Sequence, residues 1–187
     1  FTASHNPAEY NGMKMAKAGA VPVSSETGLF DIRDLAQKYL DEGSIPTVEN
    51  PGVVTEKDVL KAYAEYLRKL VDLSNIRPLK VVVDAGNGMG GKTTPAVLGD
   101  ALLPALPLEI VPLYFELDGT FPNHPANPLE PANLRDLHAA VVEHGADLGL
   151  AFDGDADRCL AVTADGDVVD GEAGEELLGV PPRRAGT

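Results

Sequence analysis

Three aspartates at alternate positions, Asp153, Asp155 and Asp157, form the stretch of this sequence with the clearest potential for chemistry. They directly follow the apolar run 148–152, and Arg158 comes next. On an extended backbone, residues two apart point to the same face, so the three carboxylates could converge on one point. Carboxylate oxygens are ligands that hard cations such as Mg²⁺ and Ca²⁺ prefer. We interpret the stretch as a metal-binding loop, with a solvated acidic turn as the alternative.

Two familiar classes of acidic loop fit this spacing poorly. An EF-hand calcium loop that began at Asp153 would need glycine at its sixth position and glutamate at its twelfth. Arg158 and Ala164 occupy those positions. A phosphatase with a strand-end aspartate nucleophile would need further catalytic residues downstream, and little of the chain follows Asp153. We therefore expect neither class.

A second group of reactive side chains lies at residues 2–7, TASHNP. Pro7 disfavours helical backbone at Asn6, which places Ser4 on a turn or loop. A serine displayed in this way can act as a nucleophile or phosphate carrier if a base and a charge-neutralising group lie near it. The alternative is a structural turn built from serine and asparagine.

Lys14 follows a turn signal, the pair Asn11-Gly12, which could join two short strands. Such a turn would carry Lys14 back toward the loop of Ser4. Near a phosphate its ammonium group could neutralise charge or move protons, and otherwise it is a solvated surface lysine.

The composition narrows the classes of function. The chain has 15 Lys+Arg against 29 Asp+Glu and a formal net charge of −14. Such a charge does not favour binding to nucleic acid or anionic membranes. The single Cys159 excludes an internal disulfide and fits a reducing compartment. No apolar run is long enough for a transmembrane helix, and we expect a soluble, cytoplasmic protein.

Two helices are predicted in the first half of the chain. The first covers residues 29–40 and stops at Gly43, and the segment 44–52 that follows is the best linker candidate. A capping box at 55–58 opens the second helix. Residues at helical spacing in this second helix are interpreted as core: Leu60, Tyr63, Leu67 and Leu70.

The second half alternates strands with helices, which predicts an α/β layer with parallel strand pairing. The predicted elements are a strand at 79–83, a helix from the glycine-rich turn to about 103, an edge strand at 108–115 interrupted by Pro112, a helix at 133–145 capped by Asn133 with Leu134, Leu137 and Val141 inward, a strand at 148–152 and a hairpin at 159–169. The last strand before the hairpin delivers the aspartate loop.

The glycines of the turn after the first of these strands, Gly86, Gly88 and Gly91, match the spacing of dinucleotide-binding domains. Backbone amides at such a helix start could bind an anion, but glycines also permit a tight strand-to-helix turn. A nucleotide- or dinucleotide-binding α/β domain is therefore an alternative hypothesis.

Five stretches together resemble the α-D-phosphohexomutase family, and most of all its bacterial phosphomannomutase/phosphoglucomutase group. They are 2–7 (TASHNP), 10–14 (YNGMK), 84–88 (DAGNG), 118–124 (DGTFPNH) and 153–158 (DGDADR). The resemblance spans nearly everything from Phe1 to about Thr163. It implies the end of the first and most of the second α/β domain of a four-domain phosphohexomutase, with a mixed sheet and flanking helices.

The resemblance also implies roles for individual residues. Ser4 matches the serine that carries the phosphoryl group, and it and the three aspartates match the ligands of an essential Mg²⁺. The resemblance also implies catalytic roles for Lys14 and His5 beside Ser4, and it places Asn6 and Arg158 in the lining of the same site. The implied reaction moves phosphate between the 1- and 6-hydroxyls of mannose or glucose, through a hexose 1,6-bisphosphate that is also the expected activator.

The same resemblance predicts how the chain is divided. Residues 1–50 would be the carboxyl-terminal part of the first domain, residues 51–169 the second domain with the metal loop, and residues 170–187 a divergent or truncated start of the third. We expect an incomplete fragment with little mutase activity alone, because the domains that hold the sugar would be missing. Its expected partners are the phosphorylated hexose and those missing domains. A non-catalytic metal-binding remnant is the remaining alternative.

Overall fold

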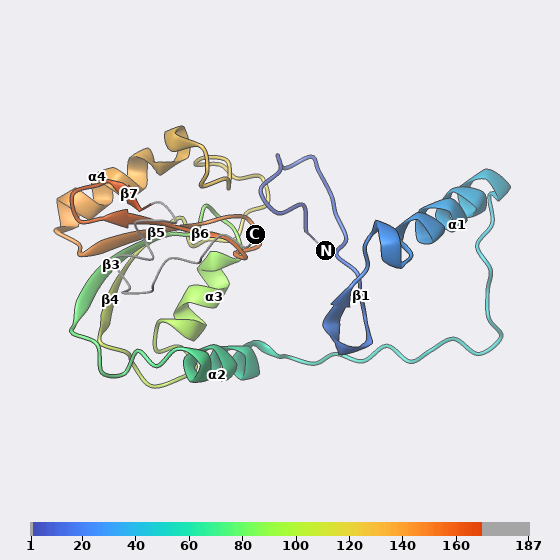
Figure 1. Ribbon diagram of the computed structural model, residues 1–187, viewed down its shortest axis with the longest axis horizontal. Coiled ribbons are helices and arrows are strands. Elements are labelled where there is room, and N and C mark those ends of the chain that lie inside the picture. The colour runs from blue at the N-terminus through green and yellow to red at the C-terminus, as the bar shows by residue number, and fades with distance from the viewer. Residues whose placement is uncertain (1, 170–187) are drawn as a thin grey trace, which may run out of the picture. The chain divides into compact units, whose positions relative to one another are not determined.

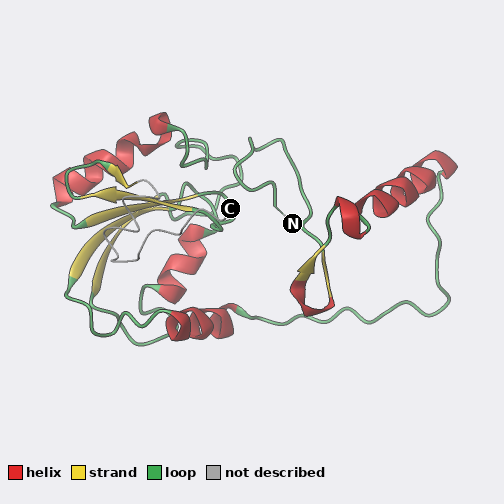
Figure 2. Cartoon of the chain, in the orientation of Figure 1, coloured by secondary structure: helices red, strands yellow, loops and turns green. Residues whose placement is uncertain are grey.

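The computed structural model describes residues 2–169, which form two compact units. The first unit contains residues 12–58, and the second contains residues 2–11 and 59–169. Most helices and strands of both units are labelled in Figure 1, and Figure 2 distinguishes helices, strands and loops by colour. Among the described residues, no helix is both long enough and apolar enough to cross a membrane.

The first unit consists of a small hairpin and one long helix. Strands β1 (Ala16–Lys17) and β2 (Val21–Pro22) pair in antiparallel fashion around the 3-10 turn η1 (Ala18–Ala20). The short 3-10 helix η2 (Ser25–Thr27) precedes α1 (Leu29–Glu42). Gly43 ends α1 in the left-handed conformation, as the sequence predicts.

The hairpin does not form at Asn11-Gly12, where the turn signal placed it. Its turn contains Gly19 and Ala20, which both have positive φ values, 75° and 59°. A tight turn of this kind needs residues in the left-handed region. Asn11 and Gly12 are not in that region, so the pair passes through an irregular segment instead.

The second unit is built on a five-stranded mixed sheet, in the order β4-β3-β5-β6-β7. The strands are β3 (Leu79–Asp84), β4 (Leu108–Leu113), β5 (Leu148–Phe152), β6 (Cys159–Thr163) and β7 (Val168–Val169). Strand β3 pairs in parallel with β4 and β5, whereas β6 and β7 continue the sheet in antiparallel fashion. The predicted α/β fold with a mixed sheet is confirmed, with β4 at the edge.

Helices cover both faces of this sheet. Helix α4 (Arg135–His144) follows the 3-10 turn η3 (Pro131–Leu134) and lies on one face. Helix α3 (Gly90–Val97) lies on the other face and packs against α2 (Leu60–Leu70), as Figure 1 shows. The main core lies under α4 and consists of Val82, Leu134, Leu137, Ala140, Val141, Ala146, Ala151 and Val162. Both faces of the sheet are covered, and the middle of β3, residues 81–83, is accordingly a continuous apolar run.

Helix α2 differs from its prediction in two ways. It begins at Leu60, after Val59, so the predicted capping box does not cap it. Its buried residue is Ala64, whereas Tyr63 and Leu70 are 45% and 60% exposed in the structure. The interpretation of the stripe as core is wrong for Tyr63 and Leu70, whereas Leu60 and Leu67 are half-buried.

Two further helix boundaries differ from the sequence-based prediction. Helix α3 ends at Val97 rather than near Leu103, because the chain turns at Gly99, whose amide donates to the carbonyl of Thr94 at 3.0 Å. Asn133 does not cap α4, since its Nδ2 donates to the carbonyl of Asn127 at 2.9 Å. The inward positions of Leu134, Leu137 and Val141 are confirmed.

The order in which the chain adds strands to the sheet reverses at β3. The connection from β3 leads through α3 to β4 on one side, and the next returns through α4 to β5 on the other side. In open α/β sheets, ligands bind beyond the carboxyl ends of the strands at such a switch point. The turn after Asp84 and the loop at Asp153 follow β3 and β5 at this edge.

Candidate active site

The loop between β5 and β6 gathers the three aspartates. The loop is a turn rather than an extended strand, and Ala156 is in the left-handed conformation. The prediction that the three carboxylates converge because they alternate along an extended backbone is therefore wrong. Asp153 is fully buried, and its Oδ1 accepts the amides of Asp157 and Arg158, both at 3.1 Å. These bonds fold the loop back on itself. One ligand atom from each of Asp153, Asp155 and Asp157 then lies within 4.8 Å of the others.

This donor set has the chemistry of a site for a hard divalent cation. All three groups offer carboxylate oxygens, which Mg²⁺ and Ca²⁺ prefer to nitrogen or sulfur. Their exposure is graded, because Asp153 is buried, Asp155 is half-buried and Asp157 is exposed. A cation held there would have one buried ligand that fixes its position and an open side toward solvent.

Ser4 stands on a tight turn. Its φ is 58°, and the amide of Asn6 closes the turn on the carbonyl of Ala3 at 3.1 Å. The Ser4 amide donates to the hydroxyl of Thr2 at 2.8 Å. A non-glycine residue in the left-handed region costs on the order of 1 kcal/mol, which these contacts must offset. The predicted turn at Ser4 is confirmed.

The hydroxyl of Ser4 meets the acidic loop directly. Ser4 Oγ donates to Asp153 Oδ2 at 2.8 Å and accepts from Arg158 Nη2 at 2.6 Å. Arg158 Nε donates to the same Asp153 oxygen at 3.0 Å, and Nη2 also contacts His5 Nδ1. Residues 149 positions apart in the chain are thus joined in one network. The carboxylate draws on the hydroxyl proton, and the guanidinium places positive charge beside the oxygen.

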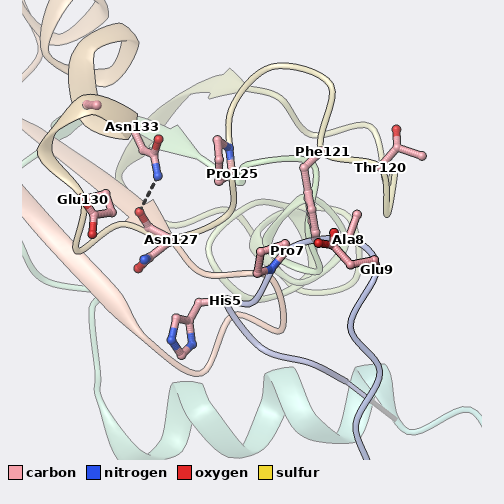
Figure 3. A pocket seen from close by; sticks show the side chains of 11 residues that line it. His5, Pro7, Ala8, Glu9, Thr120, Phe121, Pro125, Asn127, Glu130 and Asn133 are labelled. Carbon is pink, nitrogen blue, oxygen red and sulfur yellow. Dashed lines mark hydrogen bonds between the residues drawn. The ribbon is translucent and has the colours of Figure 1, made fainter.

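Two hollows lie beside the serine loop. The smaller, of about 220 Å³, is lined by Ser4, Asn6 and Gly154 among others. The larger, of about 490 Å³, is drawn in Figure 3, which shows the Phe121 side chain extending toward Pro7 and Ala8. Polar side chains of this second hollow are His5, Glu9, Thr120, Asn127, Glu130 and Asn133.

The structure therefore brings together most of the residues singled out in the sequence. Ser4, Asp153 and Arg158 contact one another, His5 contacts Arg158, and Asn6 lines the adjoining hollow. Lys14 belongs to the other compact unit, so its approach to Ser4 stays a prediction.

The glycine-rich turn after β3 donates its amides inside the protein. Gly86 donates to Asp84 Oδ1, Asn87 to the carbonyl of Tyr114, and Gly88 to that of Ala85, at 2.8, 2.9 and 2.8 Å. Met89 donates to the carbonyl of Gly154 at 3.0 Å. An anion site needs amides directed at the ligand. Four amides of this turn already donate to acceptors within the protein, which argues against the nucleotide-binding hypothesis.

A buried pair that sequence reasoning missed ties the loop after β4 to the end of β3. His124 Nε2 lies 2.9 Å from Asp84 Oδ2, and Asp84 is 1% exposed. His124 Nδ1 lies 2.9 Å from the carbonyl of Pro125, so a protonated ring satisfies both acceptors. The hydrogen bond to Asp84 raises the pKa of His124 against the opposing effect of burial. An aspartate at a strand end, with a histidine in the next polar loop, was the available signal.

We expect this pair to make stability depend on pH. Because the pKa of His124 is raised on folding, its stabilisation is complete below the unfolded pKa and is lost as pH rises through the folded pKa. His124→Gln should cost about 2 kcal/mol of unfolding free energy near pH 6, and less near pH 9. Urea denaturation of both proteins across this range measures the difference. Asp136 and Tyr114 also face the His124 ring, so neither residue is substituted in this experiment.

The exposed His144 provides the matched control for this experiment. His144→Gln should show a smaller loss of stability near pH 6 than His124→Gln. A loss in His124→Gln that stays constant or grows from pH 6 to pH 9 would contradict the assignment.

Comparisons with known proteins identify the family of this α/β chain. The family model for "Phosphoglucomutase/phosphomannomutase, alpha/beta/alpha domain II" matches residues 61–166, and that for domain I of the same family matches residues 1–42. The chain therefore belongs to the phosphoglucomutase/phosphomannomutase family. The boundaries predicted at residues 50 and 170 stay predictions, and residues 170–187 lie outside the described part of the chain.

Individual relatives agree with this assignment. The chain is 42% identical over 174 residues to a phosphomannomutase of Salmonella typhimurium, and 46% identical over 170 residues to a phosphohexose mutase protein of Xanthomonas campestris. The alignments cover 91% of this chain and 37% and 36% of those proteins. A crystal structure of a phosphoglucomutase/phosphomannomutase family protein from Burkholderia thailandensis matches with a TM-score of 0.72 and 36% identity, over 95% of this chain and 37% of that one. The chain thus spans little more than a third of the relatives' length.

Proposed function

We propose that this chain supplies the phosphoserine loop and the metal-binding loop of a phosphohexomutase, which interconverts hexose 1-phosphate and hexose 6-phosphate. The observation that carries the proposal is the hydrogen bond from Ser4 Oγ to the buried Asp153 Oδ2, at 2.8 Å, in a family whose relatives are phosphomannomutases. A serine that carries phosphate needs a polar partner for its hydroxyl and positive charge for the phosphoryl group. Asp153 and Arg158 provide these.

In this proposal, phosphorylated Ser4 gives its phosphoryl group to the free hydroxyl of a hexose phosphate. The Oγ–P bond breaks and a sugar O–P bond forms. The proton of the sugar hydroxyl passes to a base, for which His5 and Lys14 are the candidates, and Oγ takes up a proton as it leaves. In the return step the other sugar O–P bond of the hexose 1,6-bisphosphate breaks, the Oγ–P bond forms again, and the proton of the Ser4 hydroxyl passes to the freed sugar oxygen by way of the base. Arg158, which donates to Ser4 Oγ at 2.6 Å, would face the group in transfer and stabilise its charge.

The three aspartates and the phosphorylated serine are the groups that would hold Mg²⁺. Asp153 is the buried anchor, and Asp155 and Asp157 offer oxygens close to it. When bound, a divalent cation offsets the charge of the phosphate and polarises the phosphorus. The contacts with Asp153 and Arg158 orient the Ser4 hydroxyl toward this position.

The isolated chain is expected to turn over sugar phosphates poorly. It spans about 37% of the length of its relatives, and contacts to remote parts of a substrate supply much of the transition-state stabilisation in enzymes. We therefore propose that phosphorylation of Ser4, rather than turnover, is the reaction to measure in this chain. Near-full turnover of mannose 1-phosphate by the 187 residues would contradict this part of the proposal.

Incubation with glucose 1,6-bisphosphate and Mg²⁺, followed by mass spectrometry of the whole chain and its peptides, tests the assignment. We expect one added phosphate, located on Ser4, and slower incorporation when a chelator removes the metal. An unmodified chain would support the non-catalytic remnant instead. A saturable response to NAD or ATP that is lost in Gly88→Val would support the nucleotide-binding alternative.

A further inference from the structure

Three backbone segments lie directly against one another at the candidate site. A Cβ built on Gly88 would lie 2.7 Å from the carbonyl oxygen and 2.9 Å from the Cα of Gly154. A Cβ built on Gly154 would lie 2.3 Å from the carbonyl oxygen of Ser4. Separations below 3.0 Å are essentially never found for real Cβ atoms. The glycine-rich turn therefore supports the acidic loop, which in turn supports the serine loop, through glycine backbone at both contacts.

Gly88 and Gly154 need to be glycine because there is no space for a side chain, and not because their backbone conformation is unusual. Gly86 needs glycine for its φ of 51°, but neither Gly88 nor Gly154 has a positive φ. An alanine could adopt the backbone of either residue but would find no space. The amide of Met89, which donates to the carbonyl of Gly154 at 3.0 Å, fastens the first contact.

These contacts bear on the position of the Ser4 hydroxyl. Ser4 Oγ needs to stay 2.8 Å from Asp153 Oδ2 and 2.6 Å from Arg158 Nη2 to keep both hydrogen bonds. Backbone cannot rotate out of the way as a long side chain can, so an added methyl group must move a whole segment. A displacement of about 1 Å in a reacting group can cost roughly 100-fold in rate.

We propose that Gly88 is a positioning residue for Ser4 that acts through Gly154. The turn that resembles a dinucleotide-binding motif thereby sets the separation between the serine loop and the acidic loop. The kinetic part of this inference rests on the proposed function, because it requires phosphate transfer to Ser4. The structural part does not.

The test compares four variants of the 187-residue chain. Gly88→Ala and Gly154→Ala insert a methyl group at the two contacts. Gly149→Ala is the control for general destabilisation, because its Cβ would lie 2.7 Å from the Val141 side chain in the core. Gly52→Ala is the neutral control, since nothing beyond its chain neighbours lies within 4 Å of its Cβ position and its φ is not positive.

Two measurements are made on each folded variant. Amide chemical shifts of Ser4 and His5, from nuclear magnetic resonance, report the position of the serine loop without any substrate. The rate of phosphate incorporation from glucose 1,6-bisphosphate reports its reactivity. We expect Gly88→Ala and Gly154→Ala to shift both amide signals and to slow incorporation about 100-fold. Gly149→Ala should lower the unfolding midpoint while leaving the two signals in place, and Gly52→Ala should match the wild type.

Unchanged Ser4 and His5 signals in a folded Gly88→Ala variant, with an unchanged rate, would overturn the inference, as would equal shifts in Gly149→Ala. If Gly88→Ala does not fold, Gly154→Ala carries the test, because its methyl group meets Ser4 directly. If the wild-type chain takes up no phosphate but Gly88→Ala displaces the Ser4 signals, the proposed function fails and the positioning role stands.

Discussion

Ser4→Ala is expected to abolish phosphate incorporation from glucose 1,6-bisphosphate completely while the chain stays folded. The substitution removes the only atom that could form the new O–P bond at this position. Asp153 and Arg158 remain hydrogen-bonded to each other, at 3.0 Å and 2.9 Å, so no buried charge is left alone. We therefore expect a stability loss of only about 1 kcal/mol, as for one lost hydrogen bond. Mass spectrometry and urea denaturation measure the two effects.

Ser44→Ala provides the matched comparison for this variant. Ser44 is exposed and lies in the irregular segment between α1 and α2, far along the chain from the serine loop. This control should incorporate phosphate like the wild type. Phosphate found on the Ser4→Ala chain, at any other residue and at the wild-type rate, would show that Ser4 is not the carrier.

Asp153→Asn is expected to have the second largest effect, on metal binding and on stability together. Both oxygens of Asp153 accept hydrogen bonds, Oδ1 from two backbone amides and Oδ2 from Ser4 and Arg158. An amide side chain must turn an NH₂ group toward one of these sets of donors, and Arg158 loses its buried counter-charge. We expect a loss of about 3 kcal/mol in unfolding free energy. Weakening of Mg²⁺ binding should reach roughly 100-fold.

Isothermal titration with Mg²⁺ and urea denaturation test this prediction. Asp165→Asn is the control, because Asp165 is an exposed aspartate in the turn of the adjoining β6–β7 hairpin. It should change neither quantity appreciably. An Asp153→Asn chain that bound Mg²⁺ as tightly as Asp165→Asn would remove Asp153 from the set of metal ligands.

Much of the fold follows from local pattern. The strands β3 and β5 contain short apolar runs bounded by turn residues. These runs are continuous rather than alternating because helices cover both faces of the sheet. Pro112 marked β4 as an edge strand, and the glycines at 43 and 145 marked helix ends. Each of these signals depends on a few neighbouring residues, which a sequence displays directly.

The features that were missed depend on contacts between distant residues. The helical stripe of α2 gave no reason to choose Ala64 over Tyr63, because that choice depends on how closely α3 approaches. The Asp84–His124 pair joins residues 40 positions apart, and no periodicity links them. Likewise, the contact of Ser4 with Asp153 was implied by the resemblance to a family and not by spacing.

Pro112 also affects how readily the sheet could pair with a strand of another molecule. The amides of Leu79 and Ala85 donate to the carbonyls of Pro107 and Leu113. The backbone N and O atoms of odd-numbered residues in β4 therefore point toward β3, whereas those of Pro112 point away from the sheet. Its nitrogen carries no hydrogen, which interrupts the row of donors on the free border of β4. Among the described residues, the opposite border is β7, only two residues long. The free border of β4 therefore offers an invading strand no long uninterrupted template.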